Sequence, residues 1–268
     1  MASLLGNISK RIEIATKPPT KIIDRTLPRK QITLENLEDY IKEAKEFYGM
    51  GKPGDMNIAV VGAKGVGKSS LINGLIGAHD DDKEAATVGK SNENPVRYRN
   101  RLMEAMVLWE MPAGGERGHP SLTFFHDHKL YAFDWILIVS DRFHRLDFEV
   151  ARSASRLNRR CTFVRTKCDL AVQTIIQRSG IAEINAKQVL RKEVEGSFQE
   201  GLRLIGLEDR STSFNLFLVS ATAYSESHER EDDASDSHTH KFDEDRLLNY
   251  LSGLVRRGVI RRTRTMRF

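Results

Sequence analysis

Residues 62–69 read Gly62-Ala63-Lys64-Gly65-Val66-Gly67-Lys68-Ser69. They fit the pattern G-x-x-x-x-G-K-[ST], with the short apolar run 56–61 before them and a helical pattern after them. A glycine-rich turn between a strand and a helix gathers backbone N–H groups at the positive end of the helix, where phosphate oxygens bind. A merely flexible glycine turn would not explain Lys-Ser at this spacing. The stretch therefore predicts a phosphate-binding loop.

Each residue type in this loop has an expected role. Glycines let the backbone approach phosphate oxygens closely. Lys68 would neutralise the β- and γ-phosphates, which makes it a catalytic candidate, and the hydroxyl of Ser69 would coordinate Mg²⁺. The predicted phosphate-binding residues are Gly62, Lys64, Gly65, Val66, Gly67, Lys68, Ser69 and Ser70.

Strand and helix patterns alternate along the rest of the chain. Short apolar runs predict strands at 56–61, 106–109, 135–139, 161–164 and 214–219. Helical patterns lie at about 69–77, 119–132, 147–158, 183–204 and 243–256. This alternation predicts an α/β P-loop NTPase fold with a mainly parallel central sheet flanked by helices. Ligands of such sheets bind beyond the carboxyl ends of the strands.

A further helical pattern precedes the first strand. Thr33 is a candidate N-cap, and apolar residues from Leu37 onward fall on one helical face. The pattern runs out at the breaker Gly51-Lys52-Pro53-Gly54. It predicts a short helical extension on the N-terminal side of the sheet domain.

The nucleotide base is indicated by Thr166-Lys167-Cys168-Asp169, directly after the strand predicted at 161–164. This string matches the [NT]-K-x-D motif of GTPases. A carboxylate at Asp169 can accept hydrogen bonds from N1 and N2 of guanine, and adenine has no matching donors. The stem of Lys167 would lie over the base. The predicted guanine-binding residues are Thr166, Lys167, Asp169, Ser220 and Ala221.

The segment after the strand at 106–109 departs from the usual D-x-x-G motif of GTPases. It reads Glu110-Met111-Pro112-Ala113-Gly114. Glu110 stands where an Asp normally holds Mg²⁺, so we assign it to the metal and to catalysis. Ala113 replaces the glycine that donates its N–H to the γ-phosphate, and no Gln follows to orient the attacking water. These departures predict slow hydrolysis.

The first switch is expected between residues 78 and 100, where GTPases supply a hydroxyl to Mg²⁺. Thr87 and Ser91 are both candidates, and we take Thr87 as the predicted third metal ligand beside Ser69 and Glu110. The sequence does not choose between them.

Composition limits the cellular setting. No apolar run approaches the roughly 20 residues that span a bilayer. The two cysteines, Cys161 and Cys168, lack disulfide or zinc spacing, which favours the cytoplasm. The net charge is +5 and both ends of the chain are basic. We interpret the basic ends as solvated tails, and nucleic acid is not expected as a partner because no groove-reading module accompanies them.

Several stretches together resemble one family, the immunity-related GTPases (the interferon-inducible p47-type, dynamin-like group). The closest match is Phe163-Val164-Arg165-Thr166-Lys167-x-Asp169, because V-R-T-K-x-D is unusual among GTPases. The phosphate loop continues into Leu-Ile-Asn-Gly-Leu at 71–75, and Met111-Pro112 is similar to the family's D-x-P-G switch. The likeness covers about residues 55–262.

The resemblance implies a Ras-like G domain that binds GTP and GDP with Mg²⁺. It also implies a nucleotide-dependent homodimer through the nucleotide face and peripheral action at intracellular membranes. The chain departs from the family at Glu110 and Ala113, in an acidic insertion at 225–240, and in ending shortly after the closing helix. The rival interpretation is a pseudo-GTPase, an interaction or scaffold module that binds nucleotide with little or no hydrolysis.

These patterns divide the chain into four parts. Residues 1–31 form a flexible basic segment, and 32–54 the helical extension. Residues 55–258 form the G domain, which carries the acidic loop at 225–241, and 259–268 form a basic tail.

Overall fold

The computed structural model describes residues 32–79, 82–90, 92–100, 103–115, 119–221, 223–224 and 241–265. The basic segment 1–31, nearly all of the predicted acidic loop and Ser91 therefore lie outside the described residues. For 210–212 and 259–265 only the backbone is described.

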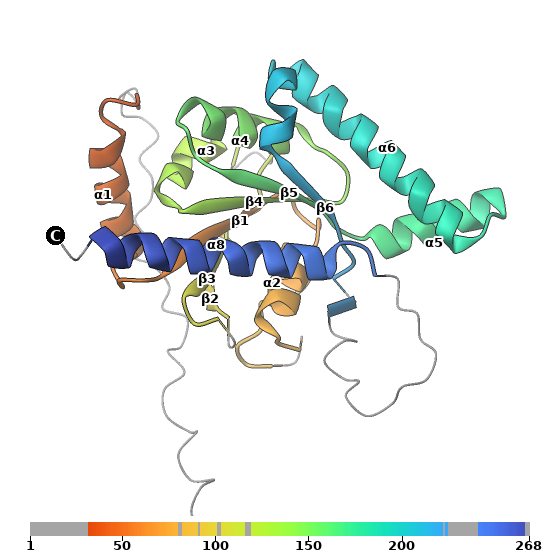
Figure 1. The fold of residues 1–268 in the computed structure, drawn as a ribbon, viewed down its shortest axis with the longest axis horizontal. Coiled ribbons are helices and arrows are strands. Elements are labelled where there is room, and N and C mark those ends of the chain that lie inside the picture. Colours follow the sequence, from red (N-terminus) through yellow and green to blue (C-terminus); the bar gives the residue numbers. More distant parts are fainter. Residues whose placement is uncertain are drawn as a thin grey trace, which may run out of the picture.

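A six-stranded sheet forms the centre of the molecule (Figure 1). Its order is β2-β3-β1-β4-β5-β6, and every pairing is parallel except that of β2 with β3. The strands are β1 Met56–Val61, β2 Val96–Arg99, β3 Met106–Glu110, β4 Trp135–Ser140, β5 Cys161–Arg165 and β6 Asn215–Leu218. The predicted α/β fold with a mainly parallel sheet is confirmed.

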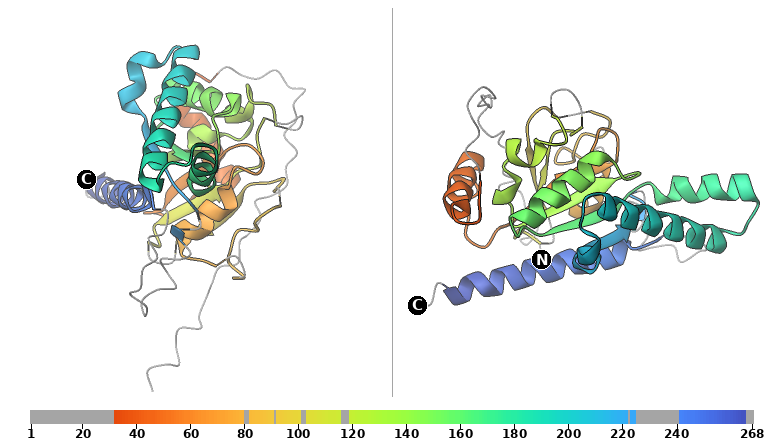
Figure 2. Two further views of the ribbon diagram at one scale, coloured as in Figure 1. Left: turned by 90° about the vertical axis from the view of Figure 1, so that its right-hand side faces the viewer. Right: turned by 90° about the horizontal axis from the view of Figure 1, so that it is seen from above.

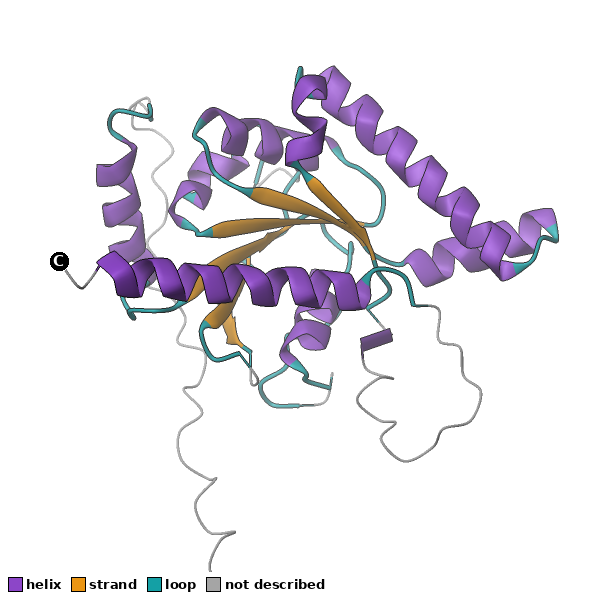
Figure 3. Cartoon of the chain, in the orientation of Figure 1, coloured by secondary structure: helices purple, strands orange, loops and turns teal. Residues whose placement is uncertain are grey.

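Helices cover both faces of this sheet (Figure 3). The longer ones are α1 Leu37–Tyr48, α2 Lys68–Ile76, α4 Arg145–Arg156, α5 Cys168–Ser179, α6 Glu183–Leu204 and α8 Glu244–Thr265. The short ones are α3 Phe124–Asp127, η1 Leu130–Ala132 and η2 Glu208–Ser213. Helices α5 and α6 contact each other and extend away from the sheet as a pair (Figure 2). No described helix is long and apolar enough to cross a membrane.

The two faces of the sheet bury two separate cores, because successive strand residues point to opposite sides. Ile58 and Val60 pack with α2 and α8. Ala59 and Val61 pack with α1, α3 and α4. All six residues of β1 are buried, which explains why its sequence is almost continuously apolar.

Helix α1 packs on the face of the sheet that carries Ala59 and Val61. The Tyr48 ring lies 5.5 Å from the Trp109 ring and 5.4 Å from the Phe133 ring, and its hydroxyl donates to the His128 carbonyl at 2.8 Å. The helix ends at Gly49 in the left-handed conformation (φ 67°), before the breaker predicted at 51–54. Its N-cap is Asn36 and not Thr33, whose N–H donates to the Asn36 side chain.

Some elements differ from the sequence predictions. The helix expected at 119–132 is only α3 followed by η1, because Lys129 between them takes a left-handed conformation (φ 45°). Strand β2 and helix α5 were not predicted. Helix α8 continues to Thr265, past the end expected at residue 256.

Candidate functional site

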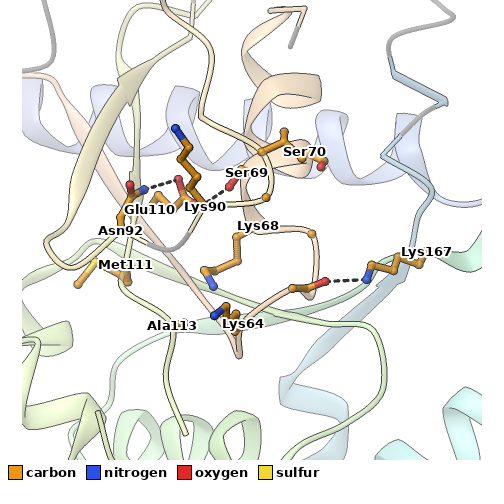
Figure 4. Close-up of a pocket in the computed structure, with 14 residues that line it drawn as sticks. Lys64, Lys68, Ser69, Ser70, Lys90, Asn92, Glu110, Met111, Ala113 and Lys167 are labelled. Atoms are coloured by element: carbon orange, nitrogen blue, oxygen red, sulfur yellow. Dashed lines mark hydrogen bonds between the residues drawn. The ribbon is translucent and has the colours of Figure 1, made fainter. Parts of the chain in front are cut away.

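A cavity of about 300 Å³ opens at the carboxyl ends of the central strands (Figure 4). Register explains its position: Val60 pairs with Glu110, so the turn after β1 and the turn after β3 leave the sheet side by side. The lining residues come from the phosphate loop, the segment before β2, the end of β3 and the turn after β5. They are Lys64, Gly65, Gly67, Lys68, Ser69, Ser70, Val88, Gly89, Lys90, Asn92, Glu110, Met111, Ala113 and Lys167.

The loop between β1 and α2 is shaped by its glycines. Gly65 (φ 75°) and Gly67 (φ 91°) occupy the left-handed region, which side chains disfavour. Gly62 has a different reason: a Cβ atom there would lie 2.2 Å from the Val139 carbonyl oxygen. The loop therefore depends on the neighbouring strand β4 as well as on its own conformation. The glycines leave a bare backbone facing the cavity, which suits a phosphate group.

Lys68, the first residue of α2, is turned toward the loop. Its ammonium donates to the carbonyls of Gly62 at 3.1 Å and Ala63 at 2.9 Å, and the residue is 8% exposed. A buried cation held by the loop at a helix N-terminus attracts anions.

Ser69 and Glu110 meet directly at the cavity wall. The Ser69 hydroxyl donates to Glu110 Oε1 at 2.6 Å, and the Asn92 amide donates to Oε2 at 3.0 Å (Figure 4). Glu110 is 3% exposed, and this burial raises the pKa of its carboxyl, against the lowering effects of Ser69, Lys68, Asn92 and Tyr98. Mg²⁺ prefers oxygen ligands, and the Ser69 hydroxyl and the Glu110 carboxylate offer two neighbouring oxygens of this kind.

The turn after β3 is joined to the phosphate loop through its backbone. The N–H of Met111 donates to the Val60 carbonyl at 3.0 Å, and the N–H of Gly114 donates to the Gly62 carbonyl at 3.2 Å. Ala113 is 6% exposed and lines the cavity. Gly114 is packed so closely that a Cβ atom would lie 2.6 Å from the Leu146 side chain.

The T-K-x-D motif contacts the same loop from the other side. Fully buried Thr166 donates through Oγ1 to the Val66 carbonyl at 2.5 Å and to the Ser140 carbonyl at 3.2 Å. The Lys167 ammonium donates to the Gly65 carbonyl at 2.6 Å. A Thr hydroxyl in place of the commoner Asn amide thus still reaches the phosphate loop.

The remaining guanine-binding candidates lie near this motif without lining the cavity. Asp169 is half-buried in the first turn of α5. The backbone N–H of Ser220 donates to the buried Glu244 carboxylate at 2.6 Å, which ties the Ser220-Ala221 turn to α8. Of the five predicted guanine contacts, Lys167 is the one that lines the cavity.

The predicted first-switch ligand is not brought to this group. Thr87 is exposed and does not line the cavity. Asn92, five residues later, reaches Glu110 instead. Sequence reasoning missed Asn92 because a single Asn in a segment without periodicity gives no signal of where it will lie.

Comparisons with known proteins place the chain in a family. A family profile described as "Interferon-inducible GTPase (IIGP)" matches residues 22–229. Interferon-inducible GTPase 1 of Mus musculus is 32% identical over 142 residues, which are 52% of this chain and 33% of that protein. Interferon-inducible GTPase 5 of Rattus norvegicus is 31% identical over 170 residues, covering 62% of this chain and 35% of that protein. The chain thus spans about a third of the length of these relatives.

Among solved structures, an oligomerised bacterial dynamin pair is similar in fold, with a TM-score of 0.52 and 18% identity over 86% of this chain and 50% of that chain. The family match covers most of the sequence and includes both the phosphate loop and the T-K-x-D motif. The chain therefore belongs to the interferon-inducible GTPase family, as the resemblance in its V-R-T-K-x-D stretch predicted.

Proposed function

We propose that this chain binds GTP and GDP together with Mg²⁺ and hydrolyses GTP slowly. One observation carries the proposal: the base motif is bonded to the phosphate loop, through Thr166 to Val66 and through Lys167 to Gly65. A single guanine nucleotide laid across this junction would contact both motifs at once. The names of the relatives, which are called GTPases, give further support.

The chain's own residues would act by positioning and by charge. Lys68 and the backbone N–H groups of the loop would bind the β- and γ-phosphates and neutralise the charge that develops between them. Ser69 and Glu110 would hold Mg²⁺, which supplies further neutralisation of the phosphate oxygens when bound. Asp169 would select guanine. Hydrolysis is expected to be slow for two reasons. Ala113 allows a narrower range of φ and ψ angles than the usual glycine beside the γ-phosphate, and no Gln follows to orient the attacking water.

The test of binding is a change of base specificity. Asp169→Asn replaces a carboxylate that accepts two hydrogen bonds by an amide that accepts one and donates one. Guanine affinity should fall at least about 100-fold, because each hydrogen bond to a charged group is worth about 1.5–3 kcal/mol. The xanthine nucleotide, with a carbonyl where guanine has an amine, should bind the variant better than it binds the wild type.

Fluorescent GDP and XDP analogues measure both affinities by equilibrium titration. Lys68→Ala is the control, because it should weaken both nucleotides in either background. Equal GDP affinity in the wild type and in Asp169→Asn would contradict the assignment of the base site, and no binding by the wild type would refute the proposal as a whole.

The pseudo-GTPase is the second candidate, and Glu110 and Ala113 favour it. Glu110 is one methylene longer than the usual Asp and already contacts Ser69. The double variant Glu110→Asp/Ala113→Gly separates the two candidates in a single-turnover assay of GTP hydrolysis. A large gain from a nearly inactive wild type would identify a pseudo-GTPase. Little change from a measurable wild-type rate would identify a slow enzyme.

The proposal extends to organisation and setting. Residues 55–258 would form the G domain, with 32–54 as an extension packed on it through Tyr48. The family relation supports a cytoplasmic protein that dimerises through its nucleotide face and binds intracellular membranes peripherally. Sedimentation velocity with GDP, GTP and a non-hydrolysable analogue tests the dimer, and monomer under all three conditions would refute it. Co-flotation with vesicles tests the membrane part.

A further inference from the structure

The Glu110 carboxylate accepts hydrogen bonds on both of its oxygens, and one of the donors does not belong to the phosphate loop. Its Oε1 accepts from Ser69 at 2.6 Å, while its Oε2 accepts from the Asn92 amide at 3.0 Å. Figure 4 shows the carboxylate between these two side chains. Asn92 comes from the segment that precedes the edge strand β2 and therefore belongs to a different wall of the cavity.

We infer that Asn92 is the first-switch positioning residue of the cation site, which holds the Glu110 carboxylate in the orientation that faces Ser69. The inference rests on the proposed function, because it concerns the same site. It assigns this role to an amide at a position that the sequence did not indicate, whereas Thr87, the hydroxyl predicted as a metal ligand, is exposed and does not line the cavity.

The physical reason lies in the geometry of a carboxylate. Ser69 on Oε1 and Asn92 on Oε2 hold the plane of the carboxylate from opposite oxygens, and Tyr98 also hydrogen-bonds to Glu110. Without Asn92 the carboxylate would keep Ser69 and Tyr98 but lose the donor that comes from the segment before β2. Glu110 is 3% exposed, so water cannot readily replace a lost donor, and a hydrogen bond to a buried charged acceptor is worth more than one at the surface. Groups that orient a metal ligand in this way commonly change metal affinity by about 10- to 100-fold when removed.

The same contact joins two walls of the cavity. Val88, Gly89 and Lys90, which precede Asn92 by two to four residues, also line the cavity. A bond from Asn92 to the end of β3 therefore holds this segment against the phosphate loop. We expect the segment to respond to the state of the cation site through this bond.

The test measures the Mg²⁺ dependence of nucleotide release. Wild-type protein is loaded with a fluorescent GDP or GTP analogue, and the dissociation rate is followed over a range of free Mg²⁺. In Asn92→Ala the Mg²⁺ concentration that half-maximally slows release should rise about 10- to 100-fold. Release in excess EDTA should be unchanged, because the cation site then contributes nothing.

Asn94→Ala is the matched control. Asn94 is the same residue type two positions later, is half-buried, and does not line the cavity, so its removal should leave the Mg²⁺ dependence unchanged. Thr87→Ala tests the rival ligand. A shift in Thr87→Ala with none in Asn92→Ala would overturn the inference.

An exchange of the two side chains distinguishes positioning from direct ligation. Asn92→Asp removes the donor and places two carboxylates together, so it should raise the Mg²⁺ requirement in the wild-type background. In the Glu110→Gln background the same change should lower it, because the glutamine amide then donates to the aspartate and the total charge is restored. If Asn92→Asp lowers the Mg²⁺ requirement in both backgrounds, the side chain at position 92 binds the cation directly, and the positioning role is overturned.

The outcomes separate this inference from the proposed function. If the wild type binds no nucleotide, both fail. If the wild type binds nucleotide in a Mg²⁺-dependent way but Asn92→Ala behaves like Asn94→Ala, the proposed function stands and the inference fails.

Discussion

The phosphate side and the base side of the cavity are held in different ways. On the phosphate side Lys68, Ser69 and Glu110 are each less than 10% exposed, and they contact backbone or one another. On the base side the Lys167 side chain is 41% exposed. Burial fixes the first side, because an unpaired buried charge is costly. The second side is fixed by a few polar contacts that water can replace.

Thr166 connects these two sides, and it is the exception to the pattern. It is fully buried although it belongs to the base motif, and its hydroxyl reaches the phosphate loop. We therefore expect substitutions to reduce stability or nucleotide affinity most in the buried phosphate loop, less at Thr166, and least at the exposed charges beside Lys167.

The largest effect is expected for Gly62→Ala. Its new Cβ atom would meet the Val139 carbonyl at 2.2 Å, so the loop or β4 must move, and we expect a loss of about 3 kcal/mol in the free energy of unfolding. Gly65→Ala is the control, because nothing lies within 4 Å of its Cβ position. Gly65→Ala should lower the free energy of unfolding by only about 1 kcal/mol, because of the positive φ at this position. Urea denaturation measures both, and equal losses would contradict the packing argument.

Thr166→Val should cost about 2 kcal/mol, because it leaves the buried Val66 carbonyl without this donor. Thr166→Ser keeps the hydroxyl and should cost less. Nucleotide release should also accelerate in Thr166→Val, since the link between the two motifs is lost. If Thr166→Ser destabilises the protein as much as Thr166→Val, then packing of the methyl group and not the hydrogen bond is responsible.

A pH effect is expected from Asp147, which lies in the first turn of α4. Burial raises the pKa of its carboxyl to about 6 from 3.8, although the N–H of His144 opposes this. The folded state therefore binds the proton more tightly than the unfolded state, so stability from this group is present below about pH 4 and is lost as the pH rises to about 6.

Asp147→Asn, which stays neutral and still accepts from His144, should lose less stability than the wild type over that pH range. Urea unfolding at several pH values between 4 and 7 checks this. Parallel stability curves for the two proteins would show that Asp147 does not titrate as described.

The smallest effect is expected for Asp141, whose carboxylate lies 3.8 Å from the Lys167 ammonium and 3.2 Å from His144 Nε2. An exposed ion pair is worth at most about 1 kcal/mol, so Asp141→Asn should weaken guanine-nucleotide affinity by roughly 2- to 5-fold. A double-mutant cycle with Lys167→Ala checks whether Asp141 acts on nucleotide affinity through Lys167. The effect of Asp141→Asn should disappear once Lys167 is removed, and a persistent effect would show that Asp141 acts elsewhere.

The elements that the sequence predicted well have strong local patterns. Strand β1 is six buried residues, and α6 occupies the predicted range 183–204. Helix α5 was missed because its only buried residues are Cys168 and Val172, too few to produce a helical period. Strand β2 was missed because it is four half-buried residues at an edge. The helix predicted at 119–132 was too long because the left-handed backbone at Lys129 divides the stretch, and the apolar pattern gives no sign of that break.

By itself the sequence determined the sheet class and the family, because these depend on short motifs in which neighbours along the chain act together, and the same motifs predicted which residues would face a phosphate and a guanine. Only the tertiary structure placed Asn92 against Glu110, Thr166 against Val66, and Asp141 against Lys167. These pairs are separated by 18, 100 and 26 residues. Their contact depends on strand order and register, which bring the carboxyl ends of separate strands to one edge and which no local pattern encodes.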